Sequence, residues 1–375
     1  MKRFSAILPV LFGTLILSMI GLYNGYPLVY SDTGTYIGSG LQEFVPTDRP
    51  VSYGLFIKLF SFNVSLWYVI LFQNLIVAYI LFELLKSFKI CGKYFNFTYL
   101  SIVAFLVLFT GIGWYSNQVM PDFFAPLVVI TIYLIFSDEN KSLLRTSLLY
   151  LVLIFSLVTH FSHLLIGLLM ILIVMCLKLI SRKFLKDIQL KKIGIVSLLL
   201  LFSWLLIPSF NYIIEKRFIL SKGNHVFLVA HLNDTGILEK FLDDKCDEEE
   251  YRDCKLCRYK DELPADLASF IWSGHILDST GGWEGSRQEY NKIIAGTLKD
   301  PGYLFLNIKK SVNYGLIQLT RNKIGQGLSA YNEGSPPYGQ IHWEFHHELN
   351  NYLNSKQNQL KGATLKLETL NTVHL

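Results

Sequence analysis

The sequence predicts an all-α polytopic membrane protein with about seven transmembrane helices and an extracytoplasmic, mainly α-helical C-terminal region. Hydrophobic residues make up 51% of the 375 residues and charged residues only 17%, whereas soluble domains average about 25% charged residues. The apolar residues fall in long blocks that end near residue 214. The sequence therefore divides into a transmembrane core, residues 1–214, and an exposed region, residues 215–375.

Seven blocks are apolar enough to be membrane helices, which need about 20 mostly apolar residues to cross the bilayer. The first block follows a basic start but exceeds the apolar stretch of roughly 7–15 residues of a signal peptide, so we expect an uncleaved helix. A shorter stretch, Val51–Phe62, contains Lys58 and is expected to be a re-entrant or interfacial helix. The expected spans are Ala6–Leu22, Leu66–Leu85, Phe97–Ile112, Phe123–Phe136, Ser147–Val158, Leu164–Leu179 and Ile193–Ile213.

The distribution of basic residues predicts the orientation, because cytoplasmic loops carry an excess of lysine and arginine. With the N-terminus in the cytoplasm, the opposite side has only Arg49 and Lys58 in its short loops. We therefore expect the loop Tyr23–Phe62, the turn Gly113–Asp122, the turn at His160–His163 and the whole C-terminal region to be extracytoplasmic. The expected cytoplasmic cations are Lys2, Arg3, Lys86, Lys89, Lys93, Lys141, Arg145, Lys178, Arg182, Lys183, Lys186, Lys191 and Lys192.

The exposed region contains one clear amphipathic pattern, near residues 302–320. Pro301 suits the first turn of a helix, and the apolar residues that follow recur close to helical spacing. An interfacial helix lying on the membrane fits this pattern, and a soluble amphipathic helix is the alternative. The apolar positions are Leu304, Phe305, Ile308, Val312, Leu316 and Leu319.

Three of the five cysteines, Cys246, Cys254 and Cys257, fall in the exposed region. An oxidising compartment favours a disulfide among them, but the sequence does not choose the pair. A zinc site and free thiols are the alternatives. Cys91 and Cys176 lie near cytoplasmic helix ends and are expected to be unpaired.

Polar clusters in the first extracytoplasmic loop are the first candidates for a functional site. Asp32 lies in the run from Tyr30 to Tyr36, and a carboxylate beside the membrane can act as a general base or hold a metal. It could equally cap a short helix. Asp48 and Arg49 follow, and a guanidinium can bind phosphate in a bidentate way. The alternatives are an Asp48–Arg49 ion pair and a helix cap.

Two more polar clusters are expected on the same side. Asp122 ends a run that includes Gln118 and begins the fourth predicted span, where the helix dipole favours an acid. An acid this close to hydrocarbon is costly without a partner or a task. His160 and His163 could bind phosphate or a metal or shuttle a proton, or form a polar turn. Four clusters on one side predict an extracytoplasmic active site.

This pattern resembles the GT-C superfamily of polytopic glycosyltransferases, of the protein mannosyltransferase and aminoarabinose transferase type. The resemblance rests on Asp32 in Ser-Asp-Thr-Gly-Thr-Tyr, Asp122 in Gln-Val-Met-Pro-Asp, and the Asp-Pro-Gly-Tyr-Leu stretch from Asp300. It implies a polyprenyl-phosphate-linked sugar as donor and a glycan, lipid or protein as acceptor, with inversion at the sugar.

The resemblance also implies roles for individual residues. Asp32 would be the general base, and Asp122 would assist the acceptor or hold a divalent ion, the one cofactor expected. The substrate-binding residues would be Arg49, Asp48, Tyr36, Gln118, His160 and His163, with the cations neutralising the departing phosphate.

Two other classes of function remain open. A transporter or flippase for a lipid-linked or anionic solute would place ionisable residues near the bilayer midplane, whereas these predicted helix interiors are nearly free of charge. A non-catalytic membrane scaffold would need no shared site. The net charge of +5 reflects the loop cations that set topology, so we expect no nucleic acid partner.

Overall fold

The computed structural model describes two compact units, each considered by itself. The first comprises Met1–Pro46, Pro50–Leu220 and Lys323–Leu375, and the second comprises Thr47–Arg49 and Ser221–Asn322. The predicted exposed region is thus divided between the two units. The described residues are 6–90, 92–137, 142–180, 188–321, 323–325, 327–359, 365, 367, 371 and 372. Outside them lie Lys2, Arg3, Cys91, Lys141, Arg182, Lys183 and Lys186.

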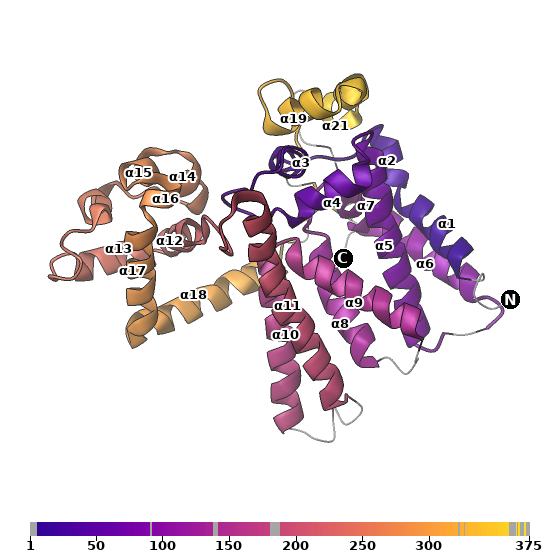
Figure 1. Ribbon diagram of the computed structural model, residues 1–375, viewed down its shortest axis with the longest axis horizontal. Coiled ribbons are helices and arrows are strands. Elements are labelled where there is room, and N and C mark those ends of the chain that lie inside the picture. The colour runs from indigo at the N-terminus through magenta and orange to yellow at the C-terminus, as the bar shows by residue number, and fades with distance from the viewer. Residues whose placement is uncertain are drawn as a thin grey trace. The chain divides into compact units, whose positions relative to one another are not determined.

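All seven predicted blocks are helical (Figure 1). Within the described residues, four helical segments are long and apolar enough to cross a membrane, so the chain has the composition of an integral membrane protein. They are Ile7–Asn24, formed by α1 (Ile7–Leu17) and α2 (Met19–Asn24), then α5 (Leu66–Ser87), α10 (Phe161–Ile180) and α11 (Leu190–Glu215). Shorter apolar helices are α6 (Phe95–Phe109), α8 (Phe124–Ser137) and α9 (Leu143–Val158). Among the described residues there is no strand, and one isolated parallel bridge joins Leu28 to Gln118.

The predicted re-entrant segment forms a helix, α4 (Ser52–Ser61), which packs closely against α3 (Thr33–Leu41). Glycine makes this approach sterically feasible. A Cβ atom on Gly40 would lie 1.9 Å from the carbonyl oxygen of Gly54. α3 also contacts α19 (Pro336–Glu344), where a Cβ atom on Gly34 would lie 2.5 Å from the backbone of Pro336.

Several basic side chains gather at one end of the first unit. Arg145 pairs with Glu83 near the end of α5, and Lys86 lies 3.3 Å from the same carboxylate. Lys192 donates to the carbonyl of Phe136 at the end of α8 (2.9 Å). These contacts join the end of α5 to the start of α9, and the end of α8 to the start of α11.

At the other end, the buried carboxylate of Glu348 binds the first loop and the start of α5. It accepts hydrogen bonds from the Tyr26 hydroxyl (2.7 Å), the Ser65 hydroxyl and the Leu66 backbone N–H (3.4 Å). Burial, followed by the charge of Glu348, raises the pKa of Tyr26 well above its ordinary value, so its hydroxyl stays protonated and donates. Ser65 also caps α5 by accepting from Trp67 (3.1 Å).

The side-chain amide of Gln357, in α21 (Lys356–Gln359), joins the same C-terminal segment to the first loop. Its oxygen accepts from the N–H of Val29 (3.1 Å), and its nitrogen donates to the Val29 carbonyl (2.8 Å). The Gln357 backbone N–H donates to Asn24 (2.9 Å). The segment after Lys323 is therefore part of the first unit. Between α19 and α21 lie η2 (His346–Glu348) and α20 (Leu349–Leu353).

The second unit is a helical body with its own core and one disulfide, Cys246–Cys257. The expected pairing among three cysteines is thereby resolved, and Cys254 is a buried free thiol whose pKa burial raises. The helices are α12 (Asn224–Asp234), α13 (Ile237–Lys245), η1 (Lys255–Glu262), α14 (Leu267–Trp272), α15 (His275–Ser279), α16 (Gly282–Gly285), α17 (Arg287–Lys299) and α18 (Pro301–Leu319).

The helix predicted near residues 302–320 is α18. Pro301 occupies its first turn and Asp300 caps it by accepting from the backbone N–H groups of Gly302 (2.8 Å) and Tyr303 (3.3 Å). The apolar positions expected from the sequence remain exposed in this structure, with Phe305 69% and Leu319 82% exposed. The amphipathic helix is confirmed, and its contact with a membrane stays a prediction.

The contacts of Glu348 predict a stability change. Glu348→Ala leaves two hydroxyls and one backbone N–H buried without their acceptor, so the free energy of unfolding should fall by about 2–4 kcal/mol. Thermal unfolding of the detergent-solubilised protein should show a lower Tm. Glu333→Ala, at an exposed site on the same segment, is the control and should leave the Tm unchanged. Equal values for both variants would contradict the account.

Candidate functional site

Two polar side chains of α5, Gln73 and Asn74, hydrogen-bond to a segment that the sequence predicts to be extracytoplasmic. The side-chain N–H of Gln73 donates to the carbonyls of Ser116 and Gln118 (both 3.1 Å). The hydroxyl of Tyr53, in α4, donates to the Gln73 oxygen. Gln73 is fully buried, so these bonds satisfy a group that would otherwise be costly inside an apolar bundle.

Asn117 is held by the second of these side chains, Asn74. The Asn74 amide donates to the Ser18 hydroxyl (3.0 Å) and to the Asn117 oxygen (3.3 Å). The Asn117 amide donates in turn to the carbonyls of Leu17 (2.7 Å) and Gly113 (2.6 Å). Three segments far apart in the sequence are thus tied together by two buried amides.

Backbone pairing then joins the first loop to the segment that ends at Asp122. The N–H of Leu28 donates to Asn117, and the N–H of Val119 donates to Leu28 (both 2.9 Å). The Thr33 hydroxyl donates to the Val119 carbonyl (3.0 Å) and accepts from the Tyr30 N–H (2.9 Å). Asp32 precedes Thr33 and Asp122 follows Val119 by three residues, so both aspartates lie on directly paired segments.

Asp32 and Asp122 each lie just before the start of a helix, α3 and α8 respectively. Asp32 occupies the N-cap position of α3, but its side chain makes no capping hydrogen bond and instead accepts from the Ser31 hydroxyl (3.3 Å). Asp122 is exposed just before α8, and its backbone carbonyl accepts from the N–H of Ala125 (3.0 Å). The carboxylate of Asp32 is partly exposed.

Tyr30 lies within electrostatic reach of both aspartates. Its pKa is raised by burial, then by Tyr331, Asp32 and Asp122. Asp122 also contributes, after burial, to the raised pKa of Tyr53 and of Tyr115. We call Asp32, Asp122 and Tyr30 the two-aspartate site. Its tyrosine stays protonated, so it can donate a hydrogen bond to a bound oxygen.

The histidine turn lies at the same end of the first unit. Phe155, one turn before it in α9, packs on Phe124 at the start of α8 (ring centroids 4.9 Å apart) and on Phe56 of α4 (4.8 Å). The rings of His160 and His163 are 5.5 Å apart. The expected proximity of the two histidines is therefore present.

The two histidines differ in exposure. His163 is 1% exposed, and its Nδ1 lies 2.8 Å from the Ser156 carbonyl and 3.2 Å from the Thr159 hydroxyl. Because a carbonyl only accepts, Nδ1 carries the proton. His160 is partly exposed, and its Nδ1 accepts from the Ser162 backbone N–H (3.3 Å) at the start of α10. Contact with a bound ligand is therefore open to His160 and not to His163 in this conformation.

Asp48 and Arg49 belong to the second compact unit. The Arg49 Nε donates to the Asp48 carboxylate (3.0 Å), and the Arg49 residue is buried, 8% exposed. The ion pair considered from the sequence is therefore present, although it is buried where a surface pair was expected. A phosphate ligand would have to share the guanidinium with Asp48.

Tyr36 and Gln118 are both buried in the first unit. The ring of Tyr36 meets that of Tyr53 edge to face, with centroids 5.1 Å apart. Gln118 accepts from Gln73 through its backbone carbonyl. Direct contact of either side chain with a bound substrate therefore stays a prediction.

Four residues that organise these loops were not predicted from the sequence: Gln73, Asn74, Glu348 and Gln357. A signal was present for the first two, since adjacent Gln and Asn inside an apolar helix of 22 residues need partners within the protein. No comparable signal marks Glu348 and Gln357, because the residues that they bind in the first loop and at the start of α5 are more than 280 residues away in the sequence.

The described part of the chain contains no group of three or more His, Cys, Asp or Glu side chains placed to hold a metal ion. The divalent ion expected from the resemblance stays a prediction. No protein family, curated protein or solved structure matches this chain.

The amide network predicts the effect of replacing Asn117. Asn117→Leu keeps a similar branched shape but removes the Asn117 donor from two carbonyls and one of the two acceptors of the Asn74 amide, so we expect a loss of about 2–4 kcal/mol in the free energy of unfolding. Denaturant titration monitored by tryptophan fluorescence measures it. Asn332→Ala, at an exposed site, should change nothing. A wild-type stability for Asn117→Leu would show that the network does not hold the loops.

Proposed function

We propose that all seven apolar helices of the first unit cross a membrane in a GT-C-like arrangement. The shorter helices have 14–16 residues and are about 21–24 Å long, against a hydrocarbon core of about 30 Å. Adjacent segments supply additional length: α7 (Ile112–Ser116) follows α6 after a short break. Each of these helices also packs against a long span: α6 on α1, and α8 and α9 on α10.

The proposed orientation has the N-terminus in the cytoplasm, the two-aspartate site outside, and the second unit outside. The basic side chains near Glu83 lie at the end of the bundle away from the aspartates. They support this orientation because lysine and arginine are enriched on the cytoplasmic side of membrane proteins. The disulfide of the second unit supports an oxidising surrounding. The cell membrane, as the cytoplasmic or inner membrane, is the proposed location.

The proposed reaction is transfer of a sugar from a polyprenyl-phosphate carrier to a hydroxyl acceptor on a glycan, lipid or protein. One observation carries the proposal: Asp32 and Asp122 lie on paired segments and act on the same tyrosine. Two acids in separate extracytoplasmic loops are the features in which the sequence resembles GT-C glycosyltransferases.

In the proposed mechanism the Asp32 carboxylate takes the proton of the acceptor hydroxyl while that oxygen bonds to the sugar C1. The bond from C1 to the carrier phosphate oxygen breaks, and the phosphate leaves with the bonding electrons, so the configuration at C1 inverts. Asp122 and Tyr30 orient the acceptor. His160, partly exposed beside this end of the bundle, balances the charge that develops on the phosphate.

A transporter is the second candidate, and the surroundings of Glu83 count against it. Glu83 is a buried carboxylate in a candidate span, but Arg145 and Lys86 neutralise it at the basic end of the helix. A substrate path would place such a charge on a central cavity. A scaffold, in turn, would not require two acids on paired loops.

Replacement of Asp32 tests the proposal. Asp32→Asn keeps the shape but removes the base, so transfer should fall by about 10²–10⁴-fold while the protein remains in the membrane. The assay uses nanodisc-embedded protein, a panel of polyprenyl-phosphate hexoses and pentoses, and acceptor lipids and glycans. Asp122→Asn should reduce transfer as well.

The matched control is Asp253→Asn, which removes a carboxylate from an exposed position of the second unit and should retain full transfer. Undiminished transfer by Asp32→Asn would remove Asp32 from catalysis. Absence of transfer by the unmodified protein with the whole panel would contradict the glycosyltransferase proposal.

A further inference from the structure

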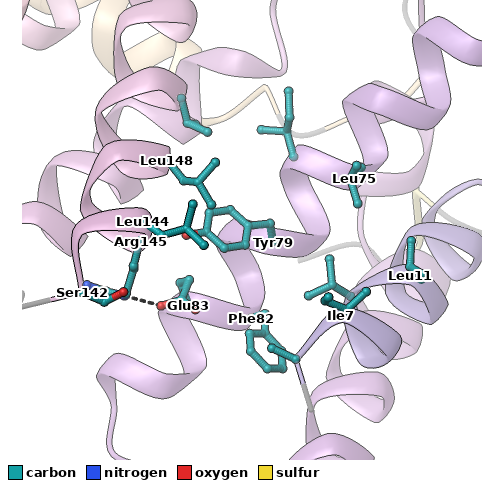
Figure 2. A pocket seen from close by; sticks show the side chains of 14 residues that line it. Ile7, Leu11, Leu75, Tyr79, Phe82, Glu83, Ser142, Leu144, Arg145 and Leu148 are labelled. Atoms are coloured by element: carbon teal, nitrogen blue, oxygen red, sulfur yellow. Dashed lines mark hydrogen bonds and ion pairs between the residues drawn. The ribbon is translucent and has the colours of Figure 1, made fainter. Parts of the chain in front are cut away.

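An apolar groove of about 800 Å³ opens between α1, α5 and α9 of the first unit (Figure 2). Figure 2 shows Leu144 and Leu148 of α9 on one side, Ile7 and Leu11 of α1 on the other, and Tyr79 of α5 between them. The volume is in the range of binding pockets, about 300–1,000 Å³. Two of its three walls, α1 and α5, belong to candidate membrane spans.

Charge is confined to one end of the groove. There Arg145 forms an ion pair with the buried carboxylate of Glu83 (Figure 2). Lys86 lies 3.3 Å from the same carboxylate, and its side chain is 46% exposed against 14% for Arg145. Among the described residues two cations thus meet one carboxylate at this end, and Lys86 is the more exposed of the two cations.

We propose that this groove binds an acyl chain of a membrane phospholipid with an anionic headgroup, with the phosphate beside Lys86. In a membrane, lipid chains fill an apolar groove between helices, because contact of its apolar walls with hydrocarbon is more favourable than their contact with water. Basic residues next to a span attract anionic headgroups. The apolar walls and the positive end therefore match the two parts of one lipid molecule.

This inference is independent of the proposed sugar transfer. The groove reaches the basic end of α5, whereas the two-aspartate site lies beyond the opposite end of the same helix. The phospholipid is a bound structural component and undergoes no reaction. Its binding can therefore be measured whether or not the chain transfers a sugar.

The first experiment fills the groove. The full-length protein is purified in detergent, incubated with dioleoylphosphatidylglycerol, and examined by native mass spectrometry. Leu148→Trp and Leu11→Trp place a large side chain in the groove from opposite walls. Each should lower lipid retention by about tenfold, the effect of losing contact with about two methylene groups.

Leu172→Trp is the matched control, since Leu172 is a 48% exposed residue of α10 that does not line the groove. It should retain the lipid at the level of the unmodified protein. Size-exclusion chromatography identifies the variants that fold, and two groove positions keep the test decisive if one variant fails. Equal retention by the folded groove variants and the control, or equal loss from all of them, would overturn the proposal.

The second experiment tests the headgroup. Lys86→Gln should weaken retention of phosphatidylglycerol and leave that of dioleoylphosphatidylcholine unchanged, whereas Lys58→Gln, at a residue outside the groove, should change neither. Equal retention of the two lipids by the unmodified protein would overturn the anionic assignment. Displacement of the phospholipid by a polyprenyl phosphate at equal concentration would identify the groove as a carrier site and overturn the phospholipid proposal.

Discussion

The structure of the first unit depends on one buried side chain, the amide of Asn117. It donates to the end of α1 and to Gly113 in α7, and it accepts from Asn74 in α5. Polar groups in a membrane interior must be satisfied within the protein, so these bonds permit few alternative arrangements. The pairing of Leu28 with the segment after Asn117 follows from this geometry.

Two further contacts extend this constraint to the end of the chain. Glu348 and Gln357 bind the first loop through a carboxylate and an amide that each make several hydrogen bonds. Asp32 therefore sits on a loop fixed on two sides, by the Asn117 network and by the C-terminal segment. Such rigidity suits the catalytic role that we propose for Asp32, because small displacements of a catalytic group lower the reaction rate by large factors.

The sequence predicted the helices well because their signal is local. Long apolar blocks, and the Pro301 that begins α18, are recognisable from short stretches of sequence, and the structure has a helix at each of them. Partners across the sequence could not be read in this way. The Cys246–Cys257 pairing, the burial of Arg49 with Asp48 and the contacts of Glu348 depend on the tertiary fold. Proximity of Asp32 to Asp122 was a hypothesis from topology, and the Thr33–Val119 hydrogen bond supplies its physical basis.

The most direct test of this account is the distance between the two loops. Nitroxide labels are attached to cysteines introduced by Ser31→Cys and Pro126→Cys, in a protein from which Cys91, Cys176 and Cys254 have been removed. Both aspartates remain in place. Pulsed electron resonance in nanodiscs should give one short, narrow distance distribution, and adding Gln73→Leu should broaden it. A long or broad distribution in the protein with Gln73 intact would contradict the claim that buried amides hold Asp32 and Asp122 in one site.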